Sequence, residues 1–187
     1  TGRDVAAMAD PLPCVVPLTS FGGAPRAEAD RPILAVDRAR HVGDGIAFVV
    51  AGTRDQARAA AELVRVEYEV LAVSSDPAEI VSEPIWPDVA DNLCFDWRYG
   101  DAEACRKLFA SAAHVVTMEL TIPRIVVNPI ETRGAIASYD PSIGKFTFVS
   151  NTQGVHFVRG VLARALRLDQ EQLRIVTPNV GGAFGSK

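Results

Sequence analysis

The sequence predicts an α+β or mixed α/β protein, because short strand patterns and short helix patterns alternate along its 187 residues. Three stretches support this: a strand–helix–strand unit early in the chain, a hairpin pattern at 134–150, and a helix pattern followed by a strand pattern at 155–177. The composition, 48% hydrophobic and 22% charged, is that of a globular chain with one domain or two small ones.

The early unit changes its hydrophobic period twice. An apolar run at 46–50 predicts a buried strand after a turn at 43–45. Thr53 followed three residues later by Gln56 fits a capping box and predicts a helix start. Strict alternation of apolar and charged residues over 64–70 then predicts a half-buried strand.

Two segments, 1–32 and 74–100, are rich in proline and irregular in pattern, so long elements are not expected there. The second is predicted to be a linker or a domain boundary. After it, Asp101 can cap a helix that runs to about residue 113, and 115–122 predicts a strand.

The last part of the chain gives the strongest local patterns. Strands are predicted at 134–139 and 145–150, joined by a turn of the sequence Asp-Pro-Ser-Ile-Gly. A periodic apolar face predicts a helix at 155–166, and 173–177 predicts a further strand.

Charge and cysteine content exclude several classes of protein. A net charge of −4 argues against a nucleic-acid surface or an anionic membrane surface. The cysteines Cys14, Cys94 and Cys105 form no CxxC pair, so we expect neither a disulfide framework nor a zinc site, and a cytoplasmic location fits best. No apolar run has the length of a membrane span, and no signal peptide is evident.

The segment "GGAFGSK", residues 181–187, is the first candidate site. Glycines allow a backbone to approach a ligand closely and to present N–H groups to an anion or a polar cofactor. The nucleotide signatures GxxxxGK[ST] and GxGxxG are both missing. The alternative is a tight turn between a strand and a helix.

A second candidate is Gln153, which lies where a predicted strand ends and a predicted helix begins. Its amide can both donate and accept hydrogen bonds, which suits an oxo group or a heterocycle. The alternative is that Asn151 and Thr152 cap the helix and Gln153 is merely exposed.

A third candidate is the pair Glu131 and Arg133, which could orient a site or form a structural ion pair. The three histidines are far apart, without metal-ligand spacing, and no Ser/His/Asp or Cys/His arrangement is evident.

Four stretches of the chain resemble one family and occur in the order typical of that family. The resemblance covers about 31–187. "PIETRGAIASYD", "NTQGVHFVR" and "GGAFGSK" are similar to three motifs of the molybdenum-binding large subunit of the xanthine dehydrogenase, aldehyde oxidase and carbon monoxide dehydrogenase family. "RHVGDGIAFVVAGTRDQARAAAELVRVEYEVL" is similar to that family's α/β-hammerhead domain. The resemblance implies an α+β fold with an N-terminally incomplete hammerhead domain at 1–82. The start of a molybdopterin-binding domain, C-terminally incomplete, would occupy 83–187.

The resemblance also implies a cofactor and a chemistry. The family uses molybdenum on a molybdopterin, in bacteria usually the cytosine dinucleotide, to hydroxylate an aldehyde, a purine or another N-heterocycle with water-derived oxygen, or to oxidise CO. FAD and 2Fe-2S clusters lie on partner subunits or domains. By resemblance, Gln153 would hydrogen-bond the metal's oxo ligand, with no direct metal ligand in this chain. The residues that would contact the cofactor are Gly181, Gly182, Ala183, Phe184 and Gly185.

The resemblance is incomplete. Ala183 and Ser186 replace common glycines of the family, and the general-base glutamate is expected beyond Lys187. We therefore expect a fragment that is inactive alone and partners with the rest of the large subunit; a homodimer is left open. The alternatives are a non-catalytic interaction or assembly module and a small phosphate- or nucleotide-binding protein that uses the glycine loop.

Overall fold

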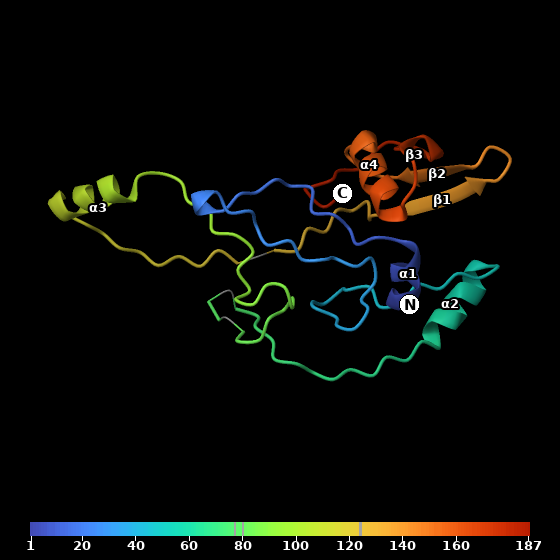
Figure 1. Cartoon of the computed structure of the whole chain (residues 1–187), viewed down its shortest axis with the longest axis horizontal. Coiled ribbons are helices and arrows are strands. Elements are labelled where there is room, and N and C mark those ends of the chain that lie inside the picture. Colours follow the sequence, from blue (N-terminus) through green and yellow to red (C-terminus); the bar gives the residue numbers. More distant parts are fainter. Residues whose placement is uncertain (77, 80, 124) are drawn as a thin grey trace.

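The computed structural model describes residues 1–76, 78–79, 81–123 and 125–187. Its central element is a three-stranded sheet in the order β1-β2-β3 (Figure 1). β1 (Ala135–Asp140) and β2 (Lys145–Ser150) form an antiparallel hairpin, and β3 (Leu173–Val176) pairs in parallel with β2. α4 (Val155–Leu166) connects β2 to β3, followed by a short 3-10 turn, η2 (Gln170–Gln172). The hairpin, the helix and the last strand are confirmed, and so is the α+β class.

The hairpin turn follows the chemistry of its sequence. Asp140 Oδ1 accepts hydrogen bonds from Ser142 N at 2.9 Å and from Ser142 Oγ at 2.6 Å. Gly144 has φ 64°, a left-handed conformation that glycine adopts without steric cost. These contacts set the register in which Asp140 faces Lys145.

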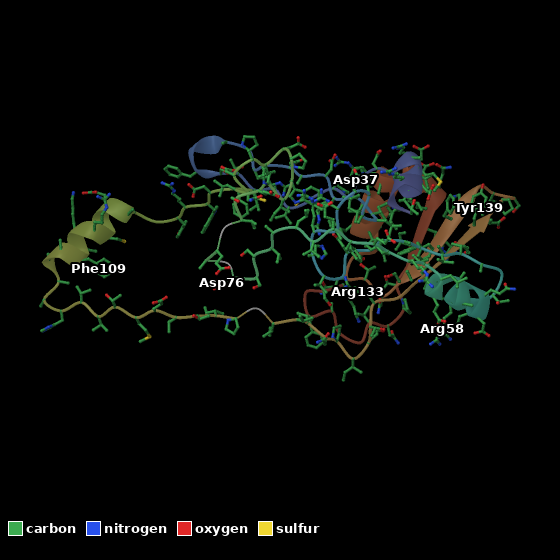
Figure 2. All side chains as sticks on the ribbon, turned by 90° about the horizontal axis from the view of Figure 1, so that it is seen from below. Asp37, Arg58, Asp76, Phe109, Arg133 and Tyr139 are labelled. Carbon is green, nitrogen blue, oxygen red and sulfur yellow. The ribbon has the colours of Figure 1, made fainter. Side chains whose placement is uncertain are left out.

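α2 (Arg54–Glu62) and α3 (Ala102–Ser111) begin at the predicted caps. Thr53 Oγ1 accepts from Gln56 N at 3.2 Å, and Asp101 Oδ1 accepts from Ala104 N at 2.9 Å. α3 lies at the far end of the molecule from the sheet, as Figure 1 and the position of Phe109 in Figure 2 both show.

The N-terminal segment, expected to be irregular, contains α1 (Gly2–Met8) and a 3-10 turn, η1 (Phe21–Gly23). Asp4 Oδ2 stabilises the first turn of α1, because it accepts from the Thr1 amino group at 2.9 Å and from Thr1 Oγ1 at 2.6 Å. Beyond α1, Asp10 N donates to Ala165 O at 2.7 Å, and Arg167 Nη2 pairs with Asp10 Oδ1 at 2.6 Å. The start of the chain is therefore tied to the end of α4.

Three predicted strands were wrong: 46–50, 64–70 and 115–122 form no strand in the structure. Figure 1 shows these segments as long traces without arrows. A strand needs a partner to satisfy its backbone groups, and within the described residues no segment pairs along these three. The irregular segment predicted at 74–100 does lack helices and strands where it is described; residues 77 and 80 lie outside the described residues.

Burial is concentrated around α4, β3 and the glycine loop. The accessible surface of the chain is 15711 Å², whereas a compact monomer of 20.0 kDa would have about 8,700 Å². The buried apolar residues are Ala9, Val89, Ala163, Ala165, Leu173 and Ala183. The part of the molecule that positions the candidate site is thus the part with the best-packed side chains.

Candidate cofactor-binding site

Three segments meet at one edge of the sheet. β2 and β3 are parallel neighbours, and Val149 lies opposite Val176 near their carboxyl ends. The loops that follow them therefore leave from the same edge, and β1 begins there too, because Ala135 lies opposite Ser150. Loops at the carboxyl ends of parallel strands commonly form ligand sites.

Asn151 ties two of these segments together. Its Nδ2 donates to Thr132 O at 2.7 Å, and its Oδ1 accepts from Gly134 N at 3.2 Å. Ser150 Oγ adds a bond to Gly134 O at 2.9 Å. The alternative in which Asn151 caps α4 is therefore wrong: the N-cap is Gly154, without a side-chain cap.

Gln153 lies in the short connection between β2 and α4. Its side chain is exposed, and no hydrogen bond to it occurs within the described residues. Among the described residues, no hydrogen bond joins Gln153 to the glycine loop, although both leave the same sheet edge. The amide is thus free for a ligand.

The glycine loop, 181–187, has an unusual backbone. Gly182, Phe184 and Gly185 have φ values of 103°, 49° and 77°. A left-handed phenylalanine is strained, and such strain is often found at ligand sites. The loop is closed by a turn in which Ser186 N and Oγ donate to Ala183 O at 2.8 and 3.0 Å.

The side chains of the loop point in different directions. Ala183 is buried, whereas Phe184 is 71% exposed. A Cβ added at Gly182 would come within 2.6 Å of the Phe184 ring, so the ring covers this glycine. A large apolar ring held outward on a strained backbone is a feature that a ligand face would explain.

The backbone N–H groups from Gly182 to Gly185 donate to no acceptor in the described part of the chain. Just before the loop, Thr177 Oγ1 is buried and also lacks a partner there. A buried polar group without a partner, such as the Thr177 hydroxyl, is rare in folded proteins. Successive free amides beside glycines with positive φ suit a polar or anionic cofactor.

Glu131 joins both ends of the loop to the segment before β1. Its Oε2 accepts from Gly181 N at 2.7 Å and from Lys187 Nζ at 2.6 Å. The Lys187 hydrogen bond and the Gly181 hydrogen bond lower the pKa of the Glu131 carboxyl below its ordinary value, against a smaller raising effect of burial.

The ion pair of Glu131 is therefore with Lys187 and not with Arg133. Arg133 instead lines a separate cavity of about 770 Å³ with residues from 12–45 and 85–95. The sequence indicated that Glu131 mattered but not its partner, which lies 56 residues away.

Other polar residues add no second site. His41 pairs with Asp44 at 3.3 Å, and the three cysteines are free. Among residues 1–76, 78–79, 81–123 and 125–187, no group of three or more His, Cys, Asp or Glu could hold a metal ion. No helix in these ranges has the length and hydropathy to cross a bilayer.

Comparison with known proteins identifies the class to which this fold and site belong. Residues 85–187 match the model of the molybdopterin cofactor-binding domain, so the chain belongs to that family of cofactor-binding proteins. Residues 15–72 match the a/b hammerhead domain of aldehyde oxidase and xanthine dehydrogenase. The expected resemblance and the hammerhead-plus-cofactor-domain fold are confirmed.

Individual relatives agree. The carbon monoxide dehydrogenase large chain of Hydrogenophaga pseudoflava is 32% identical over 83% of this chain and 21% of its own. The nicotine 6-hydroxylase large subunit of Paenarthrobacter nicotinovorans is 34% identical over 83% of this chain and 19% of its own. The solved structure of reconstituted CO dehydrogenase from Oligotropha carboxidovorans superposes with TM-score 0.79 at 27% identity, covering 100% of this chain and 24% of its own. The chain spans about a fifth of the length of the curated relatives it matches.

Proposed function

We propose that this chain forms one wall of the cofactor site of a molybdenum-dependent oxidoreductase. The observation that best supports this proposal is the conformation of the glycine loop. There, an exposed Phe184 with a strained backbone lies next to four backbone N–H groups without acceptors in the described residues. A buried, partnerless Thr177 hydroxyl precedes it. This arrangement fits a large polar cofactor better than it fits a simple turn.

In this proposal each residue has a limited role. Gly181, Gly182, Ala183 and Gly185 bring the backbone close to the cofactor, and Phe184 contacts it with its ring. Gln153 would offer its exposed amide, which has no hydrogen-bond partner within the described residues, to the oxo ligand of the metal. When bound, the cofactor would supply hydroxylation of a carbon centre, or CO oxidation, and the protein would supply binding and orientation.

The family relationship supports further parts of the proposal. The domain boundary is placed at 82–83, between the two matched ranges. The cofactor is proposed to be the cytosine dinucleotide form, with FAD and 2Fe-2S clusters on partner subunits or domains; the relatives' names, large chain and large subunit, support such an assembly. The substrate is an aldehyde, a purine, an N-heterocycle or CO. We further propose that the general-base glutamate lies outside 1–187 and that the protein is cytoplasmic.

The test is molybdenum content. The natural polypeptide carrying this chain is purified, and molybdenum and released nucleotide are measured per protein for the parent and for Phe184→Ala. Phe157→Ala is the matched control, because Phe157 on α4 is also exposed, at 59% against 71%. We expect Phe184→Ala to lose most of its molybdenum and Phe157→Ala to keep it. Equal molybdenum in both variants, or none in the parent, would overturn the proposal.

A further inference from the structure

We propose that Glu131 is a positioning residue that latches both ends of the glycine loop onto the segment entering β1. The latch is defined as Glu131, Gly181 and Lys187. The effect of the latch on cofactor binding rests on the proposed function, whereas the latch contacts themselves do not.

One oxygen atom makes both contacts. Glu131 Oε2 accepts from the backbone of Gly181 at 2.7 Å and from Lys187 Nζ at 2.6 Å, and these residues are the first and last of the loop. Both distances are short, as expected when the acceptor is charged. A single carboxylate therefore holds both residue 181 and residue 187 of this segment.

Because the Lys187 side chain is buried, its ammonium group needs the Glu131 carboxylate as a partner. The Lys187 side chain is 0% exposed, and in the described part of the chain it pairs with no other carboxylate. A hidden ammonium group is costly without a partner, so Lys187 depends on Glu131 to stay in this position. Glu131 itself is 35% exposed and can be reached by solvent.

The backbone is fitted to the latch at Gly181. A Cβ added there would lie 2.9 Å from Glu131 Cβ and 3.4 Å from its carboxyl carbon. Any larger residue would push the carboxylate away from the loop. The φ of Gly181 lies outside the left-handed region, so the backbone conformation does not require glycine there. Glycine is needed because a Cβ would collide with the Glu131 side chain.

The other side of the latch is anchored to the sheet. Asn151 at the end of β2 holds the backbone of Thr132 and Gly134 on either side of Arg133. Glu131 thus links the loop that follows β3 to a segment whose position is fixed by the sheet edge. Without the latch, the hydrogen bonds that hold the loop among the described residues would be those from Ser186 to Ala183 O.

The experiment is hydrogen exchange of the peptide that contains 181–187, measured by mass spectrometry on the natural polypeptide. Glu131→Ala should speed exchange of the Gly181 amide on the order of 10-fold or more, because a charge-assisted hydrogen bond is lost. Lys187→Met should loosen the end of the loop and leave the Gly181 bond in place. The control is Asp10→Asn, which removes another ion pair of 2.6 Å, that with Arg167, and should leave the loop unchanged.

A glycine pair gives a second, independent test. Gly181→Ala should raise loop exchange as Glu131→Ala does. Gly134→Ala should not, since a Cβ at Gly134 meets nothing within 4 Å and its N–H to Asn151 is kept. If Glu131→Ala fails to fold, Glu131→Gln and Gly181→Ala still address the latch.

Molybdenum content separates the latch from the proposed function. Faster loop exchange together with reduced molybdenum supports the positioning role. Faster exchange with full molybdenum overturns the positioning role, and unchanged exchange in Glu131→Ala and Gly181→Ala overturns the latch. A parent without molybdenum refutes the proposed function, while exchange still decides the latch.

Discussion

At the scale of single residues, the carboxylate of Glu131 sets a pH dependence for the glycine loop. Its pKa is lowered from 4.5 by the Lys187 and Gly181 hydrogen bonds, with a smaller contribution from Asn151. Because the folded pKa is below the unfolded one, this stabilisation is present above about pH 4.5 and is lost as the pH falls through the folded pKa.

We therefore predict that the loop loosens only below pH 4.5. The measurement is exchange of the 181–187 peptide between pH 6 and pH 3, corrected for the intrinsic pH dependence of exchange. Glu131→Gln should remove the transition, because its amide does not titrate. A transition of the same size in Glu131→Gln would assign it to another group.

Single residues also show the limit of sequence reasoning. Gln153 and the glycines were predicted as candidates because a strand–helix junction and a cluster of glycines are local signals. Whether they contact the cofactor stays a prediction. The Glu131–Lys187 pair could not be predicted, since it depends on three segments meeting at one sheet edge.

At the scale of elements, local signals located α2, α3, α4 and the hairpin but not α1, and they did not show which strand patterns would find a partner. Three of these signals are side chains that each accept a hydrogen bond from a backbone N–H two or three residues later: Asp101, Thr53 and Asp140. The local structure at these points therefore follows from nearby sequence. The alternating pattern at 64–70 shows that two faces differ but does not specify a neighbour. The patterns at 46–50 and 115–122 likewise specify no neighbouring strand, and those two strand predictions were also wrong.

α3 offers a prediction at this scale. It has ten residues and lies away from the sheet, so its stability depends strongly on its cap. Asp101→Ala should destabilise the helix by about 1 kcal/mol, since the Ala104 amide loses its acceptor.

Amide exchange over 102–111 measures this effect. Asp101→Asn is the control, because asparagine caps about as well as aspartate. Equal exchange in the two variants would mean that the Asp101 side chain does not stabilise α3.

At the scale of the whole molecule, apolar surface dominates the behaviour of the 187-residue chain. Its 15711 Å² exceeds by far the roughly 8,700 Å² of a compact monomer. Large side chains such as Phe109, Ile130 and Val42 are at least 65% exposed. Surfaces of this kind bind other protein surfaces.

We predict that the 187-residue chain, produced alone, self-associates and binds hydrophobic dyes. Size-exclusion chromatography with light scattering measures the mass, and the dye signal reports the exposed apolar area. A compact monomer of 20.0 kDa without dye binding would contradict this prediction.

The bond between Asp10 and Arg167 has a consequence for how the protein is made. Its two partners are 157 residues apart, so residue 10 leaves the ribosome long before Arg167 exists. Contacts of such long range form late and slow folding. During synthesis the first turn of the chain must therefore wait for α4, and in that interval its side chains are open to chaperones and proteases.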